Sequence, residues 1–373
     1  MNLLMAAFYS YLVVMALYAI FSTAISLQSY KPEKVRKGYR PRALVMVPCK
    51  GIDLTLNQNL RSLKNQRYRN YNLVAIVDSE DDSAIPDIKK AGIRMLLSSD
   101  KFKEGSGKVN ALATAINRYG SYDVYVVADS DILAGSDWLG SLIAPLANRK
   151  TGLSTTFPYF KPIDGFWSKV KMVWGLVGQG MMESKMLRFG WGGSMAFRKD
   201  LLDKKSFDFF KCSLSDDISI TKIARRKGME LAYVKEAQPT VNCADTFATF
   251  TEWANRQTAL SIRGNGNVFR LGVLSYGLSI MLLFSAVVLS LFYSYFALPL
   301  FIPIIAGLIK NHRRLKESHP VALLIQLIMP FIFISNLLRA RSMASIEWRG
   351  KKYSLSGPPN SVPPASGKLS PGE

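Results

Sequence analysis

Three long windows of this chain contain no Asp, Glu, Lys or Arg, and they constrain its fold more than any other feature. They cover residues 1–30, 271–309 and 320–338. About 20 apolar helical residues cross the hydrocarbon core of a bilayer, which is about 30 Å thick. Each window is long enough to do so. The sequence therefore predicts an uncleaved N-terminal anchor at 1–30 and C-terminal membrane helices within 271–338.

The second window is too long for one crossing, because a single helix over it would measure about 58 Å. Pro299 and Pro303 therefore indicate a hairpin of two helices. If the third window also crossed, the cations at 310–316 and those at 339–352 would lie on opposite sides of the membrane. That arrangement contradicts the positive-inside rule. One of these assignments is then wrong, or the last segment is re-entrant around Pro330.

The charge of the chain points to a membrane surface. Its 48 Lys and Arg against 27 Asp and Glu give a net charge of +21. Many cations flank the apolar windows, as on the cytoplasmic side of membrane proteins, and no recognition motif suggests a nucleic acid. These flanking cations include Lys31, Lys34, Arg36, Lys37, Arg40 and Arg42. The cysteines, Cys49, Cys212 and Cys243, are too widely spaced to indicate disulfides or a zinc cluster.

Apolar runs alternate with helical periodicity between the anchor and the second window. The runs are 43–47, 73–77 and 122–128, and the helical stretches are 56–63 and 108–117. This order predicts an α/β domain with a mainly parallel sheet that binds ligands at the carboxyl ends of its strands. A Trp- and Met-rich helix is expected within 162–188, either at the lipid interface or packed on the domain core.

Acidic side chains follow two of these runs. Asp129 and Asp131 lie two positions apart after the third run, where they could bind Mg²⁺ or Mn²⁺ or form an ordinary solvated turn. Lys108 follows small residues and could neutralise a phosphate, although taken alone an ordinary loop before a helix explains the pattern better.

A second acidic pair, Asp216 and Asp217, follows Ser215 at the start of a helical periodicity. The pair could simply favour the helix N-terminus through its dipole. It could instead provide a general base that takes a proton from an acceptor hydroxyl.

The order of these motifs resembles the family-2 glycosyltransferases, and within them the ceramide-glucosyltransferase-like membrane branch. The resemblance covers residues 40–265. It is carried by VPCKG at 47–51, NLRSL at 59–63, QRYRNY at 66–71, DSEDD at 78–82, GKVN at 107–110, DSD at 129–131, FPY at 157–159, GGSMAFR at 192–198 and DD at 216–217.

The resemblance implies a GT-A type nucleotide-sugar-binding domain that uses a divalent metal and inverts the transferred sugar. Asp129 and Asp131 match the metal-binding motif, with Asp131 the direct ligand, and Asp217 beside Asp216 matches the base. The loop at 192–198 would shape the acceptor side. Donor binding would fall to Pro48, Lys50, Asp78, Asp82, Lys108, Asp129 and Arg256.

One motif departs from the family pattern. A QxxRW-like sequence is expected near the membrane, but the region reads WANRQ at 253–257, so Arg256 keeps a pyrophosphate-binding role while the stacking Trp is displaced or absent. Trp348, Arg349, Gly350 and Tyr353 resemble a short element that follows the last membrane segment in related enzymes. That element favours a cytoplasmic tail and an even number of crossings after the catalytic domain.

We therefore expect four parts: an anchor at 1–30, a cytoplasmic catalytic domain at 40–265, membrane helices at 271–338, and a basic tail at 339–373 that is disordered from Ser356. The expected function is inverting transfer of a hexose from a nucleotide sugar, with UDP-sugars favoured, to a hydroxyl of a lipid in the cell membrane. The alternatives are a processive polysaccharide synthase and a catalytically silent membrane scaffold.

Overall fold

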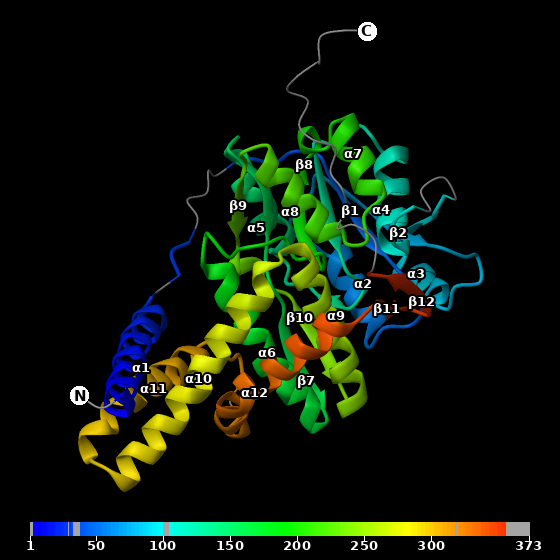
Figure 1. The fold of residues 1–373 in the computed structure, drawn as a ribbon. Helices are drawn as coiled ribbons and strands as arrows, with labels where there is room; N and C mark the ends of the chain where they lie inside the picture. Colours follow the sequence, from blue (N-terminus) through cyan, green and yellow to red (C-terminus); the bar gives the residue numbers. More distant parts are fainter. Residues whose placement is uncertain (1–2, 29, 33–37, 100–103, 318, 356–373) are drawn as a thin grey trace, which may run out of the picture.

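An α/β domain carries a group of apolar helices on one side in the computed structural model of the chain (Figure 1). The structure describes residues 3–28, 30–32, 38–99, 104–317 and 319–355. The tail expected to be disordered from Ser356 lies outside the described residues.

A seven-stranded sheet forms the centre of the α/β domain, in the order β3-β2-β1-β4-β8-β6-β9. Every strand runs parallel to the others except β8, which is antiparallel to both of its neighbours. The mainly parallel sheet that the sequence predicts is thus confirmed. The strands are β1 (Ala43–Pro48), β2 (Tyr71–Val77), β3 (Arg94–Leu97), β4 (Val124–Ala128), β6 (Thr151–Thr155), β8 (Ser194–Arg198) and β9 (Glu230–Tyr233).

Helices cover both faces of the sheet because alternate residues of its inner strands point to opposite sides. In β1, Val45 and Val47 pack with one set of helices, whereas Leu44 and Met46 pack with the other. The first set is α2 (Leu56–Lys64), α3 (Ile85–Ala91) and α5 (Trp138–Ile143). The second set is α4 (Gly107–Arg118), α7 (Lys204–Lys211) and α8 (Asp216–Arg226).

Four strands of the main sheet differ from the expectations. Residues 192–198, expected as a loop, mostly form β8, which is buried in the middle of the sheet. Strands β3, β6 and β9 have no counterpart among the predicted runs.

A second sheet of three strands begins directly after the Asp129–Asp131 turn. It consists of β5 (Ile132–Leu133), β10 (Thr240–Ala244) and β7 (Tyr159–Asp164), with β10 in the middle. Because β4 enters this turn and β5 leaves it, the turn is held between the two sheets.

The Trp- and Met-rich helix, α6 (Phe166–Glu183), is packed against protein along most of its length. Its Trp174 ring stacks on Phe333 at 5.4 Å between centroids and meets Trp253 edge-on at 4.8 Å. These partners lie on α12 (Val321–Ser342) and α9 (Phe247–Gly264). The structure thus favours the packed interpretation, although Phe166 at its start is exposed.

Within the described residues, four helical segments are long and apolar enough to cross a membrane: α1 (Leu3–Leu27), α10 (Asn267–Phe292), Tyr295–His312, and α12. The third consists of a 3₁₀ turn, η5 (Tyr295–Phe301), and α11 (Ile302–His312). The expected hairpin is therefore present, but it breaks at Tyr293 and Ser294, before Pro299. α1, α10 and α11 pack together, with the Tyr18 hydroxyl 2.7 Å from the Ser279 hydroxyl and Lys310 Nζ donating to the Ile25 carbonyl at 2.8 Å.

Helix α12 differs from the other three because both of its ends join the α/β domain. Just before it, Glu317 pairs with Lys161 at 2.8 Å. Just after it, the chain forms a hairpin of β11 (Ser345–Trp348) and β12 (Lys351–Ser354), whose Tyr353 hydroxyl accepts a hydrogen bond from Gly107 N at 3.1 Å. The helix is continuous through Pro330, so the structure does not support a re-entrant segment there.

This arrangement resolves the conflict over the positive-inside rule. If α10 and the η5–α11 segment cross and return, α12 begins and ends on the side of the α/β domain. The cations at 310–316 and those at 339–352 then share that side, as the rule requires. Under that topology the chain would make two crossings after the catalytic domain, an even number as we expect.

We predict the sidedness of three positions in sealed vesicles, using a membrane-impermeant maleimide. Native Cys212 is exposed on the α/β domain, whereas Cys49 and Cys243 are buried. In a Cys212→Ser background, Lys352→Cys on the hairpin should be labelled from the same side as native Cys212. Tyr293→Cys, which is 76% exposed at the turn after α10, should be labelled from the opposite side. Labelling of Lys352→Cys and Tyr293→Cys from one side would contradict this topology.

Candidate active site

The polar residues predicted from the sequence gather where β1, β2 and β4 end. Lys50, two residues beyond β1, pairs with Asp78, which directly follows β2, at 2.8 Å. Asp82 accepts a hydrogen bond from Gly51 N at 3.0 Å. Pro48 is the last residue of β1 and pairs in register with Ile76. The parallel strands thus bring these residues to one edge of the sheet, as expected.

Lys108 occupies the centre of the site. Its Nζ lies 2.6 Å from Asp129 Oδ1 and 3.3 Å from Asp216 Oδ2, and it donates to the Gly192 carbonyl at 3.0 Å. Ser106 caps α4 by accepting a hydrogen bond from Val109 N, which fixes Lys108 in the first turn. The Lys108 ammonium is therefore buried between two carboxylates, although Asp216 Oδ2 has no hydrogen-bond partner in the described part of the chain.

The second acidic pair lies in the first turn of α8, and its two members face different partners. Ser215 is the N-cap, as one interpretation of the sequence predicts. Asp216 is buried and faces Lys108. Asp217 accepts from Gly192 N at 3.2 Å and Ile218 N at 2.7 Å, and also from the Ser215 hydroxyl. A fixed carboxylate therefore stands beside the loop that precedes β8.

Asp131 has a buried Oδ1 atom with no hydrogen-bond partner in the described part of the chain. Carboxylate oxygens are the ligands that Mg²⁺ and Mn²⁺ prefer, so this oxygen fits a divalent cation. The described residues contain no group of three or more Asp, Glu, His or Cys arranged to hold a metal. One or two carboxylates completed by substrate phosphates and water, as is common for Mg²⁺, remain compatible with this site.

Burial dominates the ionisation of the acids in this cluster. It raises the pKa of Asp216 to about 7 and that of Asp129 to about 6, because the Lys108 ammonium offsets only part of the lost hydration. Burial alone would lower the pKa of Lys108, but Asp129 and Asp216 outweigh it and the net pKa is raised. Burial and the nearby Asp53 also raise the pKa of Asp131.

Sequence reasoning missed Asp53 and Lys351, and it placed Arg349 in an element like that of related enzymes without assigning it to this site. Asp53 accepts hydrogen bonds from the Ser130 hydroxyl and from Arg349. Lys351 lies 3.3 Å from Asp78, on the opposite side from the Lys50 contact. Asp53 could have been found because it too follows a strand. Nothing local in the sequence links Arg349 or Lys351 to this edge.

Arg256, expected to bind pyrophosphate, is not brought into the cluster by a direct contact. It lies on α9 with Nη1 3.8 Å from Glu252, one turn earlier. Burial lowers its pKa, with Arg349 adding a smaller effect of the same sign. Among the described ion pairs, those of Asp78 and Asp129 involve lysines instead.

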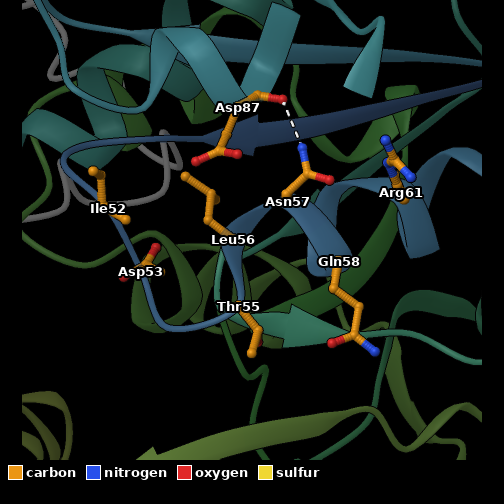
Figure 2. Close-up of a pocket in the computed structure, with 8 residues that line it drawn as sticks. All are labelled: Ile52, Asp53, Thr55, Leu56, Asn57, Gln58, Arg61 and Asp87. Atoms are coloured by element: carbon orange, nitrogen blue, oxygen red, sulfur yellow. Dashed lines mark hydrogen bonds between the residues drawn. The ribbon is translucent and has the colours of Figure 1, made fainter. Parts of the chain in front are cut away.

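An open pocket of about 530 Å³ adjoins the cluster at Asp53 (Figure 2). It lies along the loop after β1 and the start of α2, where the Asn57 amide donates to the Asp87 carbonyl at 3.4 Å. Its lining residues are Ile52, Asp53, Thr55, Leu56, Asn57, Gln58, Arg61 and Asp87. Because Asp53 is its sole member from the cluster, we regard it as a flank of the site.

A family model for glycosyl transferase family 21 matches residues 11–359. The chain belongs to this family. The match spans the anchor, the α/β domain, the apolar helices and the β11–β12 hairpin. The protein is therefore a glycosyltransferase, and the resemblance to the ceramide-glucosyltransferase-like branch is confirmed.

Two known proteins illustrate the relationship to family 21. "Ceramide glucosyltransferase 3" of Caenorhabditis elegans is 28% identical over 169 residues, which are 43% of this chain and 37% of that protein. The chain thus aligns with little more than a third of that relative. A mannosyltransferase from Pyrobaculum calidifontis, solved with GDP-Man and Mn²⁺, has a TM-score of 0.54 at 17% identity, covering 90% of this chain and 96% of that one. It confirms the GT-A type fold.

The pKa of Asp216 generates a prediction about stability. A carboxyl whose pKa is higher in the folded than in the unfolded chain stabilises most when protonated, and that contribution is lost as the pH rises through about 7. In EDTA, the change in Tm that Asp216→Asn causes, relative to wild type, should therefore be more favourable at pH 8 than at pH 5. Each kcal/mol corresponds to about 2–4 °C.

The matched control is Asp137→Asn, whose carboxylate is 62% exposed and pairs with Arg67 at the surface. It should change the Tm little and equally at both values of pH. A change in Tm for Asp216→Asn that is the same at pH 5 and pH 8 would contradict the assigned cause.

Proposed function

We propose that this family 21 glycosyltransferase moves a hexose from a nucleoside-diphosphate sugar to a hydroxyl of a membrane lipid, with inversion and with Mg²⁺ or Mn²⁺. The observation that carries the proposal is the Lys108 cluster, which joins Asp129 of the predicted metal motif to the Asp216–Asp217 pair. The cluster brings a candidate metal site and a candidate base to the same strand edge.

Donor binding is supported by the residues around the ends of β1, β2 and β4. We assign Pro48, Lys50, Asp78 and Asp82 to the nucleotide side, and Asp131 with Asp129 to the divalent ion. A bound ion would neutralise charge on the departing diphosphate. The archaeal mannosyltransferase was solved in complex with GDP-Man and Mn²⁺, which supports a metal and a nucleotide sugar. The name of the nematode relative supports glucose, so a UDP-sugar remains the proposed donor.

Asp217 is the proposed general base. Its carboxylate is oriented by two backbone N–H groups and the Ser215 hydroxyl, so it can take a proton without first reorganising. As that proton leaves the acceptor hydroxyl, the oxygen attacks the anomeric carbon and the nucleoside diphosphate departs. Lys108 is buried in ion pairs with Asp129 and Asp216, so we assign it to positioning these two acids rather than to direct phosphate binding.

A lipid acceptor is supported by the apolar helices beside the α/β domain. Helix α12 packs on α6 with Ile325, Met329 and Phe333 while Leu324 and Leu338 remain exposed. A mostly apolar helix of this kind suits protein on one side and lipid on the other. We propose a multi-pass protein of the cell membrane whose catalytic domain faces the cytoplasm, where the flanking cations place it.

The proposal predicts labelling of lipid by a radiolabelled nucleotide sugar. Membranes that contain the protein should label an organic-solvent extract when Mn²⁺ or Mg²⁺ is present and lose that labelling in EDTA. Asp131→Asn and Asp217→Asn should each lower the rate by about 100-fold or more, because general base catalysis and electrostatic stabilisation each contribute that much.

Asp137→Asn again provides the control, since it removes an exposed carboxylate six residues from Asp131 and should leave the rate unchanged. Undiminished labelling in both Asp131→Asn and Asp217→Asn would refute the residue assignments. Label in a high-molecular-weight glycan would favour a processive synthase. The absence of any product or metal-dependent nucleotide binding would favour a silent scaffold.

A further inference from the structure

The β11–β12 hairpin presents an arginine at a tight turn. Arg349 and Gly350 connect the paired residues Trp348 and Lys351, and both have positive φ, 52° and 73°. This is the backbone of a type I′ turn, which suits the twist of a two-residue hairpin. A non-glycine residue rarely adopts such a φ, so the fold holds Arg349 here against its intrinsic preference.

Three contacts hold this hairpin against three different segments of the strand edge. Arg349 pairs with Asp53 in the loop after β1, and Lys351 lies 3.3 Å from Asp78 after β2. The Tyr353 hydroxyl accepts from Gly107 N, next to Lys108. The hairpin thus spans the candidate donor site from the β2 side to α4.

The charge of Arg349 acts on the candidate metal motif as well as on Asp53. Burial would lower its pKa, but Asp53, Asp131 and Asp129 raise it overall. Lys50 and Lys351 together outweigh burial and lower the pKa of Asp78. The cations of the hairpin therefore lie within electrostatic reach of Asp53, Asp78, Asp129 and Asp131.

The cations predicted from the sequence to bind the donor are already paired with carboxylates. Lys50 pairs with Asp78, and Lys108 is buried between Asp129 and Asp216 and donates to the Gly192 carbonyl. Arg256 lies beside Glu252 on α9. A guanidinium has five N–H donors in a planar fork, so Nη2 of Arg349 can engage Asp53 while its other donors meet phosphate oxygens.

We propose that Arg349 and Lys351 bind the diphosphate of the donor, with Arg349 as the principal ligand and Asp53 as the residue that positions it. The proposal rests on the proposed function, because it presupposes a nucleoside-diphosphate donor. The pyrophosphate-binding role expected of Arg256 then belongs to the hairpin beyond α12. Tyr353 anchors this hairpin to the start of α4.

The test measures binding of UDP, UMP and uridine to the full-length, detergent-solubilised protein by calorimetry in Mn²⁺. Arg349→Gln should weaken UDP binding by about 10- to 100-fold, as expected for a lost charge-assisted hydrogen bond. Lys351→Gln should weaken it by about 2- to 5-fold, because Lys351 is half-exposed. The loss should be smaller for UMP, and uridine binding should not change.

Two further variants separate phosphate binding from support of the fold. Lys352→Gln removes the same charge one residue away, on the opposite face of β12, and should bind UDP as wild type does. Asp53→Asn keeps an acceptor for Arg349 and should leave UDP binding within about 3-fold. If Arg349 served only to neutralise Asp53, Asp53→Asn would rescue Arg349→Gln in the double variant, whereas phosphate binding predicts no rescue.

Wild-type UDP affinity in Arg349→Gln would overturn the proposal. Tighter binding would overturn it as well, and would identify the Arg349–Asp53 pair as an inhibitory contact. If the wild-type protein bound neither UDP nor GDP in Mn²⁺, the proposed function would fail together with this inference. If the wild-type protein bound UDP and Arg349→Gln bound it equally well, this inference would be refuted while the proposed function would stand.

Discussion

The buried ammonium of Lys108 is the interaction on which the rest of the site depends. Removing a charge from water is costly unless opposite charges and hydrogen bonds compensate for it. Asp129 and Asp216 compensate for Lys108, and the Gly192 carbonyl accepts a hydrogen bond from it. Since these three partners come from the end of β4, the start of α8 and the loop before β8, one side chain sets the relative positions of the elements that carry the proposed chemistry.

The same principle explains why the acids are kept close together although they repel one another. Asp129 and Asp216 have raised pKa values because Lys108 compensates their burial incompletely. A divalent cation at Asp131 would add the positive charge that this edge lacks. Without such a cation, the negative charge of the buried acids is only partly compensated. This is common in sites that bind a metal and a phosphate together.

Much of this architecture could be predicted from the sequence because it is encoded locally. Apolar runs gave β1, β2 and β4, the helical spacing gave α2 and α4, and the acids after the strands followed from the rule for parallel sheets. The antiparallel strand β8 could not be separated from a loop, since its small residues and glycine-rich start carry little strand signal. The path of α12 depends on packing against α6 and α9, which its uniform apolarity does not reveal.

The hairpin lay furthest beyond sequence reasoning, since its contacts join residues 246 and 296 positions apart. Those contacts can form only late in the synthesis of the chain. Gly107 and Asp53 leave the ribosome early, but their partners Tyr353 and Arg349 emerge only after all of the apolar helices. The strand edge is therefore completed last, and a chain interrupted between residues 217 and 349 would carry every acid of the cluster without the arginine that meets Asp53. The Arg349–Asp53 contact can form only after every apolar helix has been synthesised.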